Sequence, residues 1–488
     1  MSINAEREKV HWARLPRDLP ALEFKVHHVL PERYRRYLRR RHDAAGRGRL
    51  DELGKLDVVI GRYERRAMRS LGASVRSLLD AGDGDYPRRS SRAMSLELFH
   101  THNPGPFNQL IATAVGDWGV QDLEVVVLKP TPRRDVGYRS FPHHCFDFEG
   151  AQSPGELKLK TLKLTNCAPL TSRGAAAPAA FSSLAVLVLQ GMPKKKLLYE
   201  RVIRACPALE VLHIKSCLFR SKIAIDAPGS RVKELVFDAC TFRTVTLGAL
   251  PSLESLAWRG APLCLELGSL PLLARLNLSI YDDPNAGPDP RYAAFYGPRE
   301  EDSVLVFPGR LAGLESLVVG FTGPEMWLTP LGAPDLAVAL GGLRRLVLAD
   351  MPRSWDVRWA CRLLEAARSL ETLHVHVGDR DAGEPAYGPV ISEPPMSFEH
   401  RALREATVAG FDGSGTQLRF VGFLVSACRA LESATLLRRG RVRENGFWEW
   451  EMVASQKECP WSQEERDLVL REIRSGGVAS STVRILLG

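Results

Sequence analysis

The sequence predicts an α/β fold in which short repeats stack into a solenoid, because one apolar pattern recurs through most of its 488 residues. The pattern is Leu-x-x-Leu-x-Leu, with Val, Ile, Phe or Ala as replacements. Clear copies begin at Leu159, Leu184, Leu209, Val232, Leu253, Leu273, Leu314, Leu343 and Leu370, and weaker copies at Ala93, Leu123, Leu403 and Leu431. The clear copies from Leu159 to Leu273 start 20 to 25 residues apart, which is the period of a leucine-rich-repeat horseshoe.

In each copy, the two inner apolar positions alternate along a short strand and point into the solenoid, while the leading residue turns the chain toward it. A single repeat cannot bury this face alone, so neighbouring repeats stabilise one another. Apolar residues at helical spacing predict helices within 199–208, 357–369 and 418–430. Repeats that begin at Val232 and Leu253 are too short for a helix, and we expect them to return as extended chain. The solenoid is therefore expected to be irregular, with the extended returns at 245–252 and 265–272.

Two stretches rich in Pro, Gly and acidic residues interrupt the repeats, at 281–310 and between Val377 and Arg401. Both predict long loops. The first loop insertion contains exposed aromatic material suited to a protein interface, namely Tyr281, Tyr292, Phe295 and Tyr296. It can equally be an insertion that the solenoid tolerates.

Nine cysteines are present, an odd number in a chain whose first ten residues lack the apolar core of a secretory signal. We therefore expect reduced thiols and a cytoplasmic or nuclear location. Cys167, Cys217 and Cys240 each lie three residues after the last apolar position of a repeat, and Cys206 and Cys428 each lie three residues before the start of one. Cysteines at a fixed phase of a repeat predict small buried residues.

The net charge of +9 is concentrated at one end of the chain, because residues 1–100 hold 22 basic and 14 acidic side chains. A basic amino-terminal region on a nearly neutral body argues against a general nucleic-acid binder, whose charge should follow the working surface. No run of about 18 apolar residues occurs, so no membrane span is expected.

The segment 33–42, RYRRYLRRRH, is the most basic part of this region. It could bind nucleic acid, phospholipid or another acidic partner. Placed on a helix, however, Leu30, Tyr34, Tyr37 and Leu38 form an apolar stripe and the arginines form a solvated face. The solvated face is the favoured interpretation.

Candidate chemistry is sparse. His143, His144 and Cys145 form the tightest metal-capable cluster, but zinc needs four ligands and no second pair follows at a suitable spacing. Cys459 has no local partner that would activate its thiol, and no phosphate-binding loop, hydrolase elbow or metalloprotease motif occurs. We expect no enzymatic activity, no metal and no cofactor.

The exposed positions between the inward-pointing apolar residues define a concave surface, through which solenoids of this kind bind partners. The sequence assigns to it Lys163, His213, Lys215, Glu234, Asp238, Arg259, Arg275, Arg345, His374 and His376. This surface is mixed in charge and moderately basic. It predicts a protein partner with an acidic, partly apolar face.

Several segments of the sequence resemble those of a known protein family. Residues 98–130, 141–147 and 162–170 resemble the repeat region of plant F-box proteins of the leucine-rich-repeat type. The stretches 400–437 and 459–473 are similar to the FBD domain that closes these proteins. The resemblance implies a substrate-recognition subunit of an SCF-type ubiquitin ligase, in which an F-box binds the Skp adaptor of the cullin ligase and the repeats hold the target protein.

The start of the chain departs from that family pattern. Residues 11–26 resemble the stretch that follows an F-box, with Trp12 in the place of the closing Trp. We therefore expect the F-box to be absent or truncated, which leaves adaptor binding open. The alternative is a binding protein or decoy that is not coupled to ubiquitination.

The expected organisation has three parts: a basic, mainly helical region at 1–90, leucine-rich repeats at 91–395, and an FBD-like α/β domain at 396–488. Near the end of the chain, Ser462 and Glu465 form a capping box for a helix. Trp448, Trp450 and Trp461 are expected to form the core of this last part.

Overall fold

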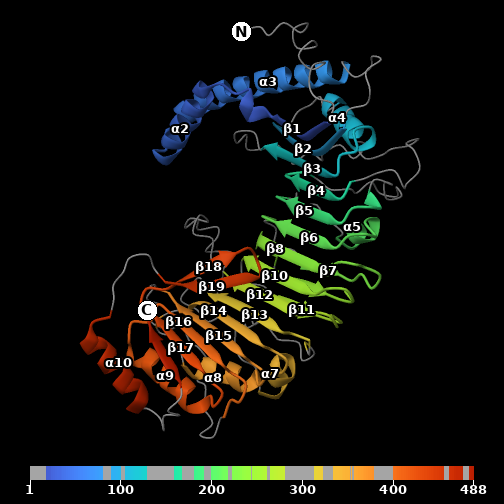
Figure 1. The fold of residues 1–488 in the computed structure, drawn as a ribbon. Helices are drawn as coiled ribbons and strands as arrows, with labels where there is room; N and C mark the ends of the chain where they lie inside the picture. The colour runs from blue at the N-terminus through green and yellow to red at the C-terminus, as the bar shows by residue number, and fades with distance from the viewer. Residues whose placement is uncertain are drawn as a thin grey trace. The chain divides into compact units, whose positions relative to one another are not determined.

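The computed structural model describes residues 18–80, 90–99, 105–128, 159–167, 181–191, 199–217, 222–242, 244–260, 264–280, 311, 313–321, 333–351, 353, 355, 357–378, 399–454, 461–475 and 483–488 (Figure 1). The chain divides into two compact units, Met1–Cys217 and Leu218–Gly488. We call them unit 1 and unit 2 and describe each by itself.

Unit 1 contains a parallel sheet whose strands follow one another in chain order. These strands are β1 (Asp18–Lys25), β2 (Ser90–Phe99), β3 (Asp122–Leu128), β4 (Thr161–Thr165), β5 (Val186–Gln190) and β6 (Val211–Lys215). The connecting elements are η1 (Val26–His28), α2 (Glu32–Gly46), α3 (Leu50–Asp80), α4 (Gly105–Gly116) and α5 (Tyr199–Ala205). Each strand therefore adds one repeat to the stack.

The core of unit 1 consists of two rows of apolar side chains that run across the strands. One row passes through Leu22, Met94, Leu123, Leu162, Leu187 and Leu212, all buried and in register. The second row is formed by the apolar residue two positions later in each strand, and it is equally buried. These rows are the two inner positions of the clear copies at Leu159, Leu184 and Leu209, so the predicted stacking is confirmed there. The weak copies predicted at Ala93 and Leu123 begin two and three residues earlier, because the buried pairs are Met94 with Leu96 and Leu123 with Val125.

Unit 2 repeats this arrangement of parallel strands in chain order. Its strands are β8 (Glu234–Cys240), β10 (Ser255–Gly260), β12 (Arg275–Ile280), β13 (Ser316–Phe321), β14 (Arg345–Met351), β15 (Thr372–Val377), β16 (Glu405–Ala409), β17 (Ser433–Leu437) and β20 (Arg484–Leu487). The helices are α7 (Ala333–Leu340), α8 (Val357–Ala366), α9 (Gly415–Ala427) and α10 (Gln463–Ser475). Two further strands, β18 (Arg441–Asn445) and β19 (Glu449–Val453), pair with each other as an antiparallel hairpin.

The connections in the repeats follow the predictions. Helices α5, α8 and α9 form where helical spacing was recognised. The short repeats return through β7 (Lys222–Ile225), β9 (Thr244–Leu247) and β11 (Cys264–Leu267), which pair in parallel as a small sheet. Repeats near 20 residues have room only for this extended return, so both kinds of connection are confirmed.

The cysteines that recur at a fixed phase are buried, as predicted. Asn166, Ser216 and Ala239 end their strands with positive φ angles of 56°, 50° and 52°. The next residue in each case is a buried cysteine whose thiol donates to the carbonyl two residues before it. Cys206 and Cys428 are also buried, and burial raises the pKa of each thiol to about 12. All five are free thiols.

The amino-terminal region is helical, but it also supplies a strand that the sequence analysis did not predict. β1 lies within 1–90 and pairs with β2, which begins at the end of that region. Likewise β16, β17 and β20 lie within 396–488 and extend the sheet that contains β15. The sheets therefore cross both expected domain boundaries, because the same alternation of apolar residues continues on either side of them.

The basic segment 33–42 lies in α2, with most of its arginines exposed. Tyr34 is buried and its hydroxyl donates to Glu64 of α3 at 3.1 Å, while the ring of Tyr37 packs against Tyr63. Leu38 departs from the predicted apolar stripe and is 36% exposed, because the contact with α3 is made by the tyrosines one turn apart. No helix in the described ranges is both long and apolar enough to span a membrane.

Candidate protein-binding surface

We define the concave face of each sheet as the face whose side chains alternate with the buried apolar rows. In unit 1, parallel register places these side chains in straight rows across neighbouring strands. The first row consists of Glu23, Ser95, Glu124, Lys163, Val188 and His213. The second row consists of Lys25, Glu97, Val126, Thr165, Gln190 and Lys215.

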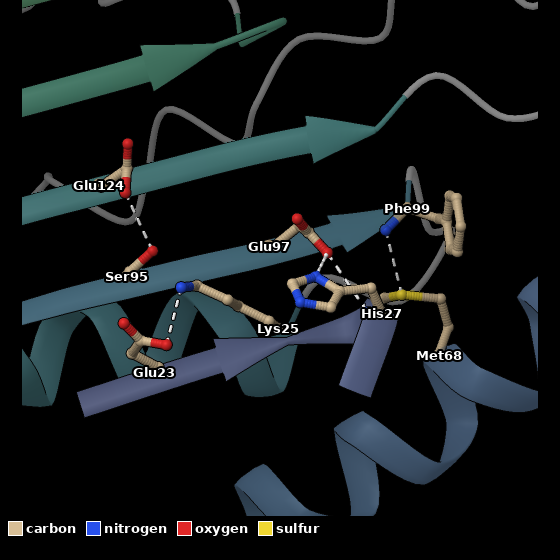
Figure 2. Close-up of polar contacts among 8 residues, drawn as sticks. All are labelled: Glu23, Lys25, His27, Met68, Ser95, Glu97, Phe99 and Glu124. Carbon is tan, nitrogen blue, oxygen red and sulfur yellow. Dashed lines mark hydrogen bonds and ion pairs between the residues drawn. The ribbon is translucent and has the colours of Figure 1, made fainter. Parts of the chain in front are cut away.

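The part of this face on β1 to β3 is predominantly acidic (Figure 2). Glu97 accepts from Nδ1 of His27 at 2.7 Å, and Glu124 accepts from the Ser95 hydroxyl at 3.1 Å. Lys25 pairs with Glu23 at 2.7 Å, and this hydrogen bond lowers the pKa of the Glu23 carboxyl below its ordinary value. The Glu23 carboxylate therefore remains ionised at neutral pH.

The part on β4 to β6 carries the positive charge. Lys163 is exposed at the middle of β4, and His213 and Lys215 are half-buried on β6. These three residues are where the sequence analysis predicted them. The charge of the concave face of unit 1 thus changes from acidic on β1 to β3 to basic on β4 to β6.

The sequence analysis missed the acidic part of this surface. A signal was present in LPALEF, residues 19–24. Leu19, Leu22 and Phe24 have the same spacing there as the apolar residues of the other repeats. The weak copy at Ala93 likewise places Ser95 and Glu97 between its buried positions. Residues 19–24 lie within 11–26, and the resemblance of that stretch to the sequence after an F-box implies no strand.

In unit 2, the corresponding positions also form rows. One row contains Glu234, Ser255, Arg275, Ser316, Arg345 and Thr372, and the next contains Val236, Ala257, Asn277, Val318, Val347 and His374. From Val236 to Val347, every member of the second row is at most 2% exposed. A row of the concave face that is fully buried must be covered.

The cover is the hairpin formed by β18 and β19, residues 441–453, which we call the hairpin. Trp450 is 2% exposed and packs against Val318, Val347 and Ala349, with Val442 and Met452 beside it. β19 also lies against β15 and β16. The hairpin therefore rests on the concave face of unit 2, over the middle strands (Figure 1).

Polar contacts fix the tip of the hairpin. The Trp448 indole N–H donates to Glu234 at 3.0 Å, and Arg259 pairs with Glu444 at 3.0 Å. Asn277 donates to the carbonyl of Phe447 at 2.6 Å. The hairpin is thus held by side chains from β8, β10 and β12.

Arginines of the concave face also contact the hairpin. Arg345 donates to the backbone carbonyls of Trp448 and Trp450. Arg275 lies over the Trp448 ring, 5.1 Å from its centroid, and Arg259 lies 5.5 Å from the centroid of Phe447. Both distances are in the range of cation–π attraction.

His374 and His376 alternate on β15, as predicted. Burial, and next the positive charge of Arg345, lower the pKa of His374 to about 4. His374 is therefore neutral at physiological pH. On the same strand, Nδ1 of His376 lies 2.9 Å from a carboxylate oxygen of Asp350.

The structure separates the ten predicted surface residues into two groups. Lys163, His213 and Lys215 lie on unit 1, and the other seven lie on unit 2. Within unit 2, the hairpin contacts Glu234, Arg259, Arg275 and Arg345 directly, and Asp238 lies 3.9 Å from Arg259. The sequence analysis gave no sign that a segment 103 to 214 residues further along the chain contacts them.

The predicted role of the tryptophans requires a correction. Trp461 packs against Phe411 and under Arg438, in the carboxy-terminal part as expected. Trp448 and Trp450, in contrast, contact the concave face rather than a separate core. Trp448 lies in the turn of the hairpin and Trp450 on β19, and both meet the sheet because the hairpin rests on it.

In the ranges the structure describes, no three His, Cys, Asp or Glu residues are placed to hold a metal ion. His143, His144, Cys145, Cys459 and the loop insertion 281–310 lie outside the described residues.

Comparisons with known proteins agree with this architecture. Residues 114–273 match the family model described as "FBD-associated F-box protein At5g56370, LRR repeats". The repeats are leucine-rich repeats. They are similar to those of an F-box protein over the matched residues.

No curated protein matches the chain significantly. Among solved structures, the crystal structure of a TLR13–ssRNA13 complex aligns with 14% identity and a TM-score of 0.35. That alignment covers 73% of this chain and 43% of the other, so this chain spans less than half of that structure.

Proposed function

We propose that this protein is a protein-interaction module that binds its partner through the concave faces of its leucine-rich repeats. The observation that carries this proposal is the pair of polar rows on the concave face of unit 1. Neighbouring strands lie about 4.8 Å apart, so six strands present a rigid surface about 24 Å wide. A surface of this width and mixed charge suits a folded protein partner.

The charge-reversal variant Lys163→Glu/Lys215→Glu tests this surface. Tagged wild type and variant are purified from plant cells, and the co-purified proteins are compared by quantitative mass spectrometry. The variant is expected to lose at least tenfold of the main partner, because reversed charges at a complementary interface repel. The matched control is Arg201→Glu, an exposed position on α5. Equal partner recovery from all three proteins would refute the role of this face.

We further propose that the partner is a ubiquitination target and that the chain is the substrate-recognition subunit of an SCF-type ligase, in the cytoplasm or nucleus. The support is the similarity of residues 114–273 to the repeats of an F-box protein. Purified chain mixed with a Skp-type adaptor is expected to co-elute with it in gel filtration. Separate elution would exclude the ligase role for this chain.

The alternative is a binding protein or decoy that is not coupled to ubiquitination. It is supported by residues 18–80, which supply β1, α2 and α3 of unit 1. Because β1 pairs with β2 of the repeats, these residues belong to the repeat stack and do not form an F-box there. In that case the partner set from the tagged chain contains target proteins and lacks cullin subunits.

A second candidate function uses the basic helices. α2 exposes Arg33, Arg35, Arg36, Arg39 and Arg40, and α3 adds further exposed arginines. These side chains suit an acidic surface such as nucleic acid or a phospholipid membrane. Retention on heparin that falls steeply with salt, and that Arg35→Glu/Arg39→Glu abolishes, would support it; unchanged retention would exclude this segment.

A further inference from the structure

The hairpin fills a face that leucine-rich repeats otherwise present to partners. We propose that it is the internal occupant of a peptide-binding site on unit 2, and that a partner segment with an aromatic residue beside a carboxylate displaces it. This displacement presupposes the proposed binding function, and it specifies one surface and one partner chemistry.

The hairpin itself shows which chemistry the face recognises. Glu444 pairs with Arg259 at 3.0 Å, while the Trp448 ring lies against Arg275 and its N–H reaches Glu234. Trp450 enters the apolar patch formed by Val318, Val347 and Ala349. An aromatic ring next to a carboxylate therefore meets a complementary group at each point.

The arginines of the face still have capacity for a carboxylate. Arg275 donates to the Ser255 hydroxyl at 2.8 Å and contacts a ring, and Arg345 donates to backbone carbonyls. Within the described residues, neither guanidinium forms an ion pair, although Glu449 and Glu451 of the hairpin attract Arg345 at longer range. Since charge-assisted pairs at hydrogen-bond distance are stronger than bonds to neutral acceptors, a partner carboxylate in direct contact with these arginines gains more here than the hairpin does.

Two buried atoms show that the hairpin fits imperfectly. The indole N–H of Trp450 and Nδ1 of His374 are buried and lack a hydrogen-bond partner in the described part of the chain. A buried polar atom left unpaired costs free energy. A partner segment that pairs with Nδ1 of His374 avoids part of that cost.

The hairpin can leave without disrupting the sheet beneath it. Among the described strands, β18 and β19 pair through their backbones only with each other, so no strand of the repeats loses a backbone neighbour when the hairpin leaves. Just before the hairpin, Arg438 forms two hydrogen bonds with Glu465 at the start of α10, at 3.0 and 2.9 Å. This pair keeps the base of the hairpin in place while its tip departs.

A competition experiment with the full chain tests the proposal. The probe is a fluorescent peptide of residues 441–453, measured by fluorescence anisotropy. A full chain in which 441–453 is replaced by a Gly-Ser segment of equal length is expected to bind the peptide at least tenfold more tightly than wild type. A peptide with both Trp448→Ala and Trp450→Ala is expected not to bind.

Two variants of the hairpin-replaced chain serve as matched controls. Arg345→Glu is expected to weaken peptide binding at least tenfold, whereas Lys163→Glu on unit 1 is expected to leave it unchanged. Equal peptide affinity of wild type and the replaced chain, or no affinity in a replaced chain with wild-type circular dichroism, would overturn the proposal.

Hydrogen exchange on the wild-type chain covers the case in which the replaced chain does not fold. Amides of β18 and β19 are expected to exchange at least a hundredfold faster than those of β14, because opening the hairpin leaves the repeats folded. Equal protection would overturn the proposal. Partner loss caused by Lys163→Glu/Lys215→Glu is measured independently, so displacement can fail while the binding function stands.

Discussion

Single side chains decide what the concave face of unit 2 can contact. Trp450 buries its ring between Val318 and Val347, and Trp448 joins Arg275 to Glu234. A ring of this size fills area that shorter residues would leave open to water. Trp448 and Trp450 therefore contact Glu234, Arg275 and Arg345, which the sequence analysis assigned to an exposed binding surface.

Gly410 shows how tightly neighbouring repeats approach. Its φ angle is +73°, and a Cβ atom there would overlap the carbonyl oxygen of Val377. We predict that Gly410→Ala lowers the free energy of unfolding by at least about 2 kcal/mol, because both strain and a clash with rigid backbone result. The matched control is Gly415→Ala, at the first residue of α9 with open space around it, where urea denaturation should show no loss.

His374 predicts a pH dependence of stability. Its pKa is lowered to about 4 in the folded chain, whereas an unfolded histidine has a pKa of about 6.5. As pH falls below 6.5, the unfolded state takes up the proton and the folded state does not, so this contribution is present above pH 6.5 and is lost toward pH 4. We expect a loss of about 1 to 2 kcal/mol between pH 7 and pH 5.

Comparison with His374→Gln isolates this contribution. Urea unfolding of both proteins at pH 7 and pH 5 should show a smaller loss for the variant, since glutamine does not titrate. The groups that face His374 are Arg345 on β14 and the strand β19. Equal losses in the two proteins would contradict the prediction.

At the scale of elements, the repeat pattern is sufficient for most strands and their returns. Leu159, Leu184 and Leu209 are each at most 1% exposed, and each precedes a strand. β1 was not predicted although Leu22 and Phe24 alternate as in the other repeats, because residues 11–26 resemble the stretch that follows an F-box. The apolar repeat pattern therefore predicts the strands better than the expected domain boundaries do.

The capping box at the start of α10 is a confirmed local prediction. The backbone N–H of Glu465 donates to the Ser462 hydroxyl at 3.1 Å, and the backbone N–H of Ser462 donates to Glu465 at 2.8 Å. That second bond, followed by Arg438, lowers the pKa of the Glu465 carboxyl. Both donors at the helix terminus are thereby satisfied.

We predict that Ser462→Ala destabilises α10 by about 1 kcal/mol, the usual cost of losing such a cap. Hydrogen exchange of the α10 amides measures the change, which should appear as faster local exchange. Ser462→Asp is the matched control, because a carboxylate at this position also accepts from the third residue and favours a helix start. Identical exchange in Ser462→Ala and wild type would show that the box contributes nothing.

At the scale of the whole molecule, each unit has its own buried core. Leu187 in unit 1 and Leu346 in unit 2 are both fully buried. We predict that Leu187→Ala and Leu346→Ala each cost about 3 kcal/mol. Because contacts in a stack of repeats are local, each substitution should accelerate exchange in its own unit far more than in the other.

Hydrogen exchange resolved by peptide, at a low concentration of denaturant, measures this selectivity. The two substitutions are matched controls for each other, since both remove the same atoms from a leucine row. Equal acceleration in both units by either variant would show that the chain unfolds as one cooperative body.

The sequence by itself determined the solenoid, the kind of connection in most repeats, the burial of the phased cysteines and the cap of α10. All of these depend on contacts between residues close in the chain or one repeat apart, which periodicity records. Only the tertiary structure decided that the concave face of unit 2 is covered. The pairs Trp448 with Glu234 and Arg259 with Glu444 are separated by 214 and 185 residues. No local pattern records an attraction over such a distance, since Glu234, Arg259 and Glu444 each have the sequence signature of an exposed residue and Trp448 that of a core residue of the carboxy-terminal part.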